Sequence, residues 1–213
     1  MSGTGRAAHW DEAYAGGDAT RSWHQPQAVM SLRMLEAAGV TAADSLIDVG
    51  GGESVLAGAL LDRGSGDVTV LDISSAAISC ARQRLGPRAA AVHWLTADLL
   101  TWHPARTWRV WHDRAVYHFL TAAADQDRYR QALDDATQPG ATAVLGCFAP
   151  DGPQHCSGLP VTRYSARGLS AQLKGWTLIS QAREEHRTPA GRIQPFTWAA
   201  LRRDGVVGPA PAY

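Results

Sequence analysis

The chain has 213 residues, of which 45% are hydrophobic, and its 20 basic side chains balance 20 acidic ones. This length suits one α/β domain with a sizeable core, and the zero net charge argues against a broad electrostatic surface for nucleic acid or anionic membrane. The chain has no apolar run long enough for a membrane span, and residues 1–6 lack the apolar core of a signal peptide. We therefore expect a cytoplasmic protein without nucleic-acid or membrane partners, either a monomer or a homodimer.

Residues 9–39 have a helical pattern that is broken near Trp23. Ser22 and Pro26 flank this position, and together they indicate the end of one helix and the start of another. We expect residues 1–40 to form an N-terminal helical segment, residues 41–204 the main domain and residues 205–213 a frayed tail.

A glycine-rich turn between two strands is the strongest motif. Leu46–Val49 is a short apolar strand, Gly50-Gly51-Gly52-Glu53-Ser54 follows it, and a second strand ends at Asp72. Glycine lets the backbone pass close to a ligand in torsions closed to other residues, and a carboxylate at position 72 can accept two hydrogen bonds from a ribose diol. Nucleotide-like cofactors are held in this way in open α/β sheets.

Strand and helix patterns alternate through most of the main domain, which predicts βαβ units and a parallel sheet. The expected strands are residues 45–49, 68–71, 92–95, 107–112 and 142–147, and the expected helices are residues 54–63, 74–85 and 125–136.

The pattern changes after Cys147. Residues 148–164 are expected to form an active-site loop, because long polar loops of this kind are often lids or binding walls. A helix is expected over 165–173, and residues 176–181 and 195–202 indicate an antiparallel strand pair. Between them, the charged run 184–187 is expected on a solvated turn.

The glycine motif also permits a dinucleotide site, but two features disfavour it. The turn lacks the later glycine that seats a pyrophosphate, and Asp48 at the strand end would repel that group while suiting a cation.

The Asp-x-Gly-x-Gly pattern resembles that of class I S-adenosylmethionine-dependent methyltransferases, with Ser54 where many members carry a third glycine. The resemblance implies a Rossmann-like α/β fold: a seven-stranded, mostly parallel sheet with a reversed edge strand and helices on both faces. It also implies S-adenosylmethionine as cofactor and S-adenosylhomocysteine as product.

The resemblance assigns cofactor contacts along the carboxyl ends of the strands. Asp72 would hold the ribose, Asp98 the adenine amino group, and Leu99 would pack on the ring. Asp98 has an alternative role as a helix or turn cap. The full set of expected cofactor residues is Asp48, Gly50, Gly51, Gly52, Ser54, Asp72, Ile73, Asp98, Leu99, His112 and Trp23.

The residues after the fourth strand are expected beside the transferable methyl group. Asp113-Arg114-Ala115 is similar to the corresponding stretch of thiopurine- and thiol-type small-molecule methyltransferases. The Asn/Asp-Pro-Pro-aromatic pattern of enzymes that methylate nucleic-acid or glutamine amino groups is missing here. The likeness implies a small acceptor with a sulfur, nitrogen or other soft nucleophile, although oxygen and carboxylate acceptors stay open.

Candidate catalytic residues flank the same segment. His112 and His118 are titratable near neutral pH, and Arg114 has a planar fork suited to an anion. Each has a structural alternative: the histidines as hydrogen-bonded packing groups, and Arg114 as the partner of Asp113, Asp125 or Asp127. The expected substrate-binding residues are Tyr14, His24, Arg114, Tyr117, His155 and Cys156.

The chain has three cysteines, too few for a disulfide framework. Cys80 is expected in the core. Cys147 and Cys156 are either a buried and an incidental thiol or two members of a soft-ligand site, and no resident metal is expected.

Trp10, Tyr14 and Trp23 lie in the segment that covers the cofactor in the resembling enzymes. The alternative is that these aromatic side chains form the core face of a helix.

The sequence therefore predicts an enzyme that transfers a methyl group from S-adenosylmethionine to a small molecule by in-line displacement. Three alternatives stay open. They are a protein or RNA methyltransferase, a non-catalytic cofactor-binding module, and a nicotinamide-dependent oxidoreductase.

Overall fold

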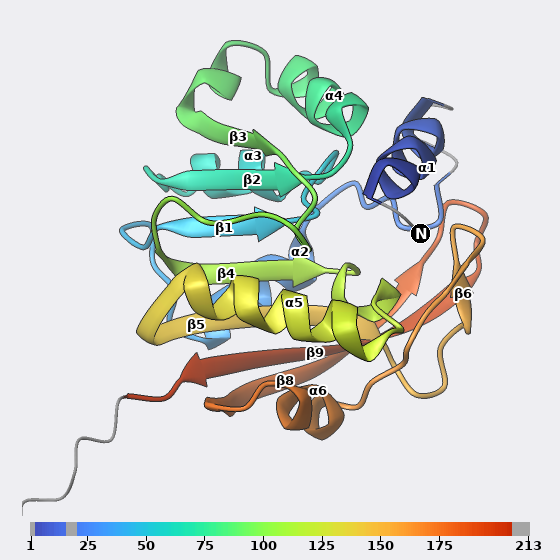
Figure 1. Ribbon diagram of the computed structural model, residues 1–213. Coiled ribbons are helices and arrows are strands. Elements are labelled where there is room, and N and C mark those ends of the chain that lie inside the picture. The colour runs from blue at the N-terminus through green and yellow to red at the C-terminus, as the bar shows by residue number, and fades with distance from the viewer. Residues whose placement is uncertain (1–2, 16–20, 206–213) are drawn as a thin grey trace, which may run out of the picture.

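The computed structural model describes residues 3–15 and 21–205, so the expected tail lies, apart from Gly205, outside the described residues. One seven-stranded sheet, in the order β3-β2-β1-β4-β5-β9-β8, forms the centre of the molecule (Figure 1). Only β9 runs against its neighbours, and it lies between β5 and the edge strand β8. The strands are β1 (Leu46–Val49), β2 (Val68–Asp72), β3 (Val92–Thr96), β4 (Trp108–Arg114), β5 (Thr137–Phe148), β8 (Trp176–Arg187) and β9 (Ile193–Arg203). The Rossmann-like fold predicted from the sequence is confirmed.

Helices cover both faces of this sheet, as expected. On one face α5 packs against β5 and α6 against β8 and β9. On the other face α2 packs against β5, β8 and β9, and α3 packs against β2 (Figure 1). The helices are α1 (Gly3–Ala15), α2 (Val29–Ala37), α3 (Leu56–Asp62), α4 (Ser75–Leu85), α5 (Ala123–Asp135) and α6 (Ala166–Gln172), with short 3₁₀ turns η2 (Gly86–Ala91) and η3 (Tyr117–Phe119). None of these described helices is long and apolar enough to cross a membrane.

The helices bury two apolar clusters, one on each face of the sheet. Trp111, Tyr129 and Leu145 belong to the first, and Leu56, Phe148 and Trp198 to the second. Strands β1 and β2 are buried along their whole length, as expected for parallel strands covered on both sides.

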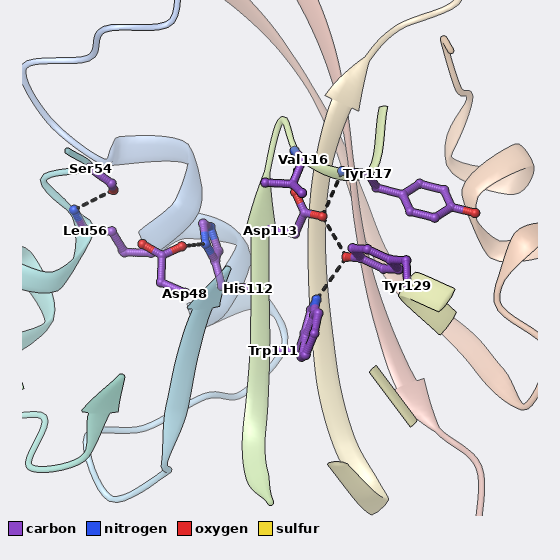
Figure 2. A network of polar contacts seen from close by, with 9 residues as sticks. All are labelled: Asp48, Ser54, Leu56, Trp111, His112, Asp113, Val116, Tyr117 and Tyr129. Carbon is purple, nitrogen blue, oxygen red and sulfur yellow. Dashed lines mark hydrogen bonds and ion pairs between the residues drawn. The ribbon is translucent and has the colours of Figure 1, made fainter. Parts of the chain in front are cut away.

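The end of β4 is fixed by a buried carboxylate. Side chains alternate along this strand, so Trp111 and Asp113 point to the α5 face and His112 to the other (Figure 2). Asp113 accepts hydrogen bonds from the backbone N–H groups of Val116 (2.8 Å) and Tyr117 (3.0 Å) and from the Tyr129 hydroxyl (2.6 Å). These bonds hold the chain in a sharp turn directly after the strand.

Two predictions about the C-terminal half need correction. The charged run 184–187 lies on strand β8 and not on a turn, because β8 and β9 extend the expected strand pair to Arg187 and Ile193. Alternation along β8 buries His186, whose ring contacts the Ser22 carbonyl at 2.7 Å. The loop after β5 is also partly ordered as a hairpin of β6 (His155–Cys156) and β7 (Leu159–Pro160).

We predict that Tyr129→Phe lowers the free energy of unfolding by about 2–3 kcal/mol, because it removes one bond to Asp113 and leaves the buried Trp111 Nε1 without its acceptor. Tyr164→Phe is the control, since that hydroxyl accepts a longer 3.2 Å bond from Gln126, and it should cost less than about 1 kcal/mol. Urea unfolding measures both. Equal losses would contradict the role given to Tyr129.

Candidate active site

The turn after β1 brings three strand ends into contact. Gly50 has a φ of 63°, and a Cβ at this position would overlap the Val116 side chain, which follows β4. A Cβ on Gly52 would lie 2.6 Å from Asp72 Oδ2 at the end of β2. Only glycine therefore allows β1, β2 and β4 to end this close together.

A cavity of about 430 Å³ opens above these strand ends. Its floor includes Gly50, Asp72 and Asp98, α1 contributes His9, Trp10 and Tyr14, and the β6–β7 hairpin contributes a further side. The remaining wall is mostly apolar: Leu71, Ile73, Leu99, Leu100, Val116, Phe119, Leu120, Leu159 and Pro160. This volume lies within the range of about 300–1,000 Å³ that small-ligand sites occupy.

Asp72 is the most strongly perturbed carboxylate in the cavity. It is 5% exposed, and its Oδ1 accepts a hydrogen bond from Ser74 N at 2.8 Å. Burial, reinforced by the neighbouring Asp48, raises the pKa of Asp72 from 3.8 to about 7. A buried carboxylate whose ionised form is disfavoured by burial suits a ligand that donates hydrogen bonds to it.

Asp98 takes the cap role considered for it from the sequence, and it also lines the cavity. Its Oδ1 accepts a hydrogen bond from Leu100 N at 3.1 Å, which caps the turn after β3. Its Oδ2 forms a 2.8 Å ion pair with Arg6 of α1 and Asp98 also lines the cavity. The carboxylate is thus both a local cap and a contact for the segment above it.

Helix α1 lies beside the carboxyl ends of the strands, where it covers the cavity (Figure 1). Asp11 fastens it to the start of α4 by accepting a 2.6 Å bond from the Ser74 hydroxyl. Arg21 ties its other end to the glycine turn: it forms an ion pair with Glu53 and donates to the carbonyls of Ala13 (3.0 Å) and Tyr14 (2.7 Å). The aromatic side chains of this segment therefore face the cavity rather than only a helical core.

A smaller cavity of about 70 Å³ lies on the other side of the glycine turn. Asp48 and His112 meet in its wall, with Oδ1 and Nδ1 2.7 Å apart (Figure 2). Among the described residues, neither Asp48 Oδ2 nor His112 Nε2 has a hydrogen-bond partner. The other expected residues of this cavity are Gly51, Ser54 and His24, whereas Tyr14, Trp23, Gly50 and Arg114 line both cavities.

Three predicted substrate or catalytic residues do not reach either cavity. Tyr117 is fully buried against Tyr129 and Tyr164. His118 is also fully buried, its Nδ1 accepts a 3.3 Å bond from Phe148 N, and burial lowers its pKa to about 3. His155 is exposed on β6. The first two are core residues because η3 turns them inward from the end of β4.

The two cysteines considered as a joint site are separated. Cys147 belongs to the cluster under α5, while Cys156 belongs to the cluster on the opposite face and lines the larger cavity. Burial raises the pKa of both thiols. Among the described residues, no three metal-ligating side chains come together.

Several residues of the site were missed from the sequence. Arg6 and His9 reach the cavity from α1, and Arg21 binds the glycine turn from the segment before Trp23. The one available signal was the helical spacing of Arg6, His9 and Trp10, which places them on one face of a helix. Arg21 has no local signal, because its partner Glu53 is distant in sequence.

Comparison with known proteins identifies the central part of the chain. Residues 46–140 match the model of a methyltransferase domain family, a span that includes the glycine turn, Asp72 and Asp98. Residues 46–140 of the chain therefore form a methyltransferase domain. A search of curated protein sequences finds no match.

Solved structures share the methyltransferase's fold over nearly its whole length. A protein studied for the conversion of a disulfide bond into a thioacetal group during echinomycin biosynthesis is 24% identical, with a TM-score of 0.72 over 93% of this chain and 92% of that one. The N-methyltransferase NodS from Bradyrhizobium japonicum, in complex with S-adenosylhomocysteine, is 15% identical, with a TM-score of 0.72 over 93% and 98%. The 1,6-didemethyltoxoflavin-N1-methyltransferase from Burkholderia thailandensis is 16% identical, with a TM-score of 0.67 over 96% and 92%.

The residues of the methyltransferase fit S-adenosylmethionine. The close approach of Gly52 to Asp72 forms a cradle that a Cβ would fill, and the cavity joins this cradle to Asp98 and Leu99. Ionisation of this carboxylate is costly in the empty cavity. Hydrogen bonds from the hydroxyl groups of a ribose would stabilise its ionised form.

We predict that Asp72→Asn stabilises the unliganded methyltransferase at pH 8 by on the order of 2 kcal/mol and leaves stability nearly unchanged near pH 4. The folded protein holds this proton more tightly than the unfolded chain, so wild-type stability falls as the pH rises from 3.8 to about 7. Asn has no carboxyl group to ionise, so the variant should not lose stability over this pH range. Urea unfolding at a series of pH values measures it, and parallel curves for the two proteins would contradict the assignment.

The same substitution should weaken binding of S-adenosylhomocysteine by about 1.5–3 kcal/mol, the scale of hydrogen bonds to a charged group. Titration calorimetry at pH 8 measures this. Unchanged affinity would place the ribose away from Asp72.

We predict that Asp11→Ala lowers the affinity for S-adenosylhomocysteine about fivefold to tenfold, because α1 loses its bond to Ser74. Glu12→Ala, which removes the same charge one residue along the helix, is the control. Calorimetry gives the affinities, and limited proteolysis should show faster cleavage within α1 for Asp11→Ala only. Identical behaviour of the two variants would remove Asp11 from the docking of α1.

Proposed function

We propose that the methyltransferase methylates a small molecule at a sulfur, nitrogen or other soft nucleophile. The observation that carries this proposal is the form of the cavity: α1 lies over it, the β6–β7 hairpin forms one side, and its lining is mostly apolar. A cavity of this size, beneath a fastened helix, suits a small acceptor better than a folded protein or RNA.

Cofactor binding is proposed along the strand ends. Asp72, with Ile73 beside it, would hold the ribose, while Asp98 and Leu99 would hold the adenine. The glycine turn from Gly50 to Ser54, with Asp48 and His112 behind it and Trp23 above, would hold the rest of the molecule. Asp98 would then exchange part of its contact with Arg6 for the adenine amino group.

Bound S-adenosylmethionine supplies a methyl group on a sulfonium, which needs no acid to leave. The chain's own contribution would be alignment and exclusion of water, for which the covered cavity and the aromatic cluster of Trp10, Tyr14, Trp23 and Phe119 are suited. Residues 1–40 are thus proposed as the cover, and residues 148–164 as an active-site loop that contributes Cys156.

A proton acceptor is needed only for acceptors that enter protonated. Of the two histidines first considered, His112 alone lines a cavity, with Asp48 orienting its Nδ1 side. His24 lines the same cavity. We propose His112 as the candidate base and assign His118 to the core.

The relatives support a small acceptor without naming one. The structure of the Burkholderia thailandensis enzyme contains bound 1,6-didemethyltoxoflavin, which is a small molecule. NodS is described as an N-methyltransferase, and the echinomycin work concerns a disulfide, so nitrogen and sulfur both occur among similar folds.

Label transfer tests the proposal. The methyltransferase is incubated with methyl-tritiated S-adenosylmethionine and a cell extract, and the products are separated into small-molecule, protein and nucleic-acid fractions. We expect label in the small-molecule fraction, and less of it with Asp72→Asn as the matched control, because that variant is expected to bind the cofactor more weakly. Label confined to protein or RNA would refute the acceptor class, and intact cofactor binding without any transfer would favour a binding module.

A further inference from the structure

An arginine with buried donor atoms, Arg114, stands where the two cavities meet. Arg114 ends β4 and lines both the larger and the smaller cavity. Its guanidinium lies over the Phe196 ring, 5.0 Å from the centroid, and its Nη1 donates a 3.0 Å bond to the Trp23 carbonyl. These contacts orient the side chain but do not neutralise its charge.

The charge has no direct counterion in the part of the chain that the structure describes. Glu184 and Asp48 are the carboxylates whose charge acts on it, and each has another partner: Glu184 accepts bonds from Trp198 (2.8 Å) and Gln25 (2.9 Å), and Oδ1 of Asp48 contacts His112. Burial lowers the pKa of Arg114 from its ordinary value. A guanidinium whose buried donor atoms lack partners is costly for the empty protein, so an anion that pairs with those atoms removes part of that cost.

The unused donors have a definite shape. Nε and Nη2 of Arg114 are buried and have no hydrogen-bond partner among the described residues. These two atoms form one edge of the guanidinium, and that edge donates two parallel bonds to the two oxygens of a carboxylate. The pattern of satisfied and unsatisfied atoms therefore selects a planar anion rather than a single hydrogen-bond acceptor.

The position of Arg114 indicates which molecule brings the carboxylate. Asp72 and Asp98 follow β2 and β3, on one side of β4 in the sheet order, whereas the hairpin with Cys156, Leu159 and Pro160 follows β5 on the other side. Arg114 thus lies between the end of the cavity proposed for adenosine, at Asp72 and Asp98, and the wall formed by the hairpin. The apolar neighbours on the hairpin side suit the body of an acceptor.

We propose that Arg114 binds a carboxylate of the acceptor, so that the acceptor is a small apolar acid whose methyl-accepting atom is positioned by this contact. This inference rests on the proposed methylation of a small molecule. It assigns Arg114 to recognition, and it disfavours acceptors that enter as organic cations.

The test uses benzoate as the probe, with benzamide as its neutral counterpart and benzylamine as the cation. Calorimetry on the intact methyltransferase saturated with S-adenosylhomocysteine should show benzoate binding at least tenfold more tightly than either. Arg114→Gln should lower the affinity for benzoate at least tenfold, and Arg114→Lys should retain part of that affinity. In both variants the affinity for S-adenosylhomocysteine should stay within threefold of the wild-type value. Arg109→Gln, an exposed arginine on the same strand, is the matched control and should change nothing.

Two results would overturn the inference. Equal binding of benzoate and benzamide to the wild type would do so even if Arg114→Gln failed to fold. A tenfold loss of S-adenosylhomocysteine with unchanged binding of 5′-methylthioadenosine, which lacks the carboxylate, would assign Arg114 to the cofactor. Neither result affects the label-transfer assay, so label in protein or RNA would refute the small-molecule proposal whatever benzoate does.

Discussion

The close approach of three strand ends at the glycine turn is the constraint on which the site depends. Gly50 leaves room for Val116 after β4, and Gly52 leaves room for the Asp72 carboxylate after β2. Asp113 then holds the far side of this junction through Tyr129 and two backbone N–H groups, which sets the direction in which Arg114 leaves its strand. A side chain at either glycine would separate these strand ends. The cofactor cradle and the acceptor side of the cavity therefore both depend on the same two glycines.

Buried charge is the second feature of this junction. Burial raises the pKa of Asp72 to about 7, and Arg114 lacks a carboxylate partner among the described residues. Both are unfavourable in the empty protein, and both become favourable when a ligand supplies the complementary group. Perturbed groups of this kind cluster at functional sites, where stability is lost so that ligands can be bound. The helix α1 lies over the same cavity and contributes His9, Trp10 and Tyr14 to its lining.

The sequence predicted the half of the site that depends on local pattern. The turn from Gly50 to Gly52 and the carboxylate Asp72 follow from strand ends and spacing, and the alternation of elements predicted the sheet. Contacts between distant segments were not predictable: the ion pair of Arg21 with Glu53, the contact of Arg6 with Asp98, and the inward turn of Tyr117 and His118 depend on tertiary packing. The strongly polar composition of residues 184–187 favours a turn. Only the alternation that places His186 inward indicates a strand, and this signal is weak in a run of four residues.

The central claim is that the covered cavity holds S-adenosylmethionine with its ribose on Asp72. A crystal structure of the methyltransferase with S-adenosylhomocysteine tests it most directly. The account predicts both ribose hydroxyls within hydrogen-bond distance of the Asp72 carboxylate, adenine beside Asp98 and Leu99, and the sulfur facing the turn after β4. A ligand that left Asp72 without contact, or that lay outside the space between α1 and the strand ends, would contradict it.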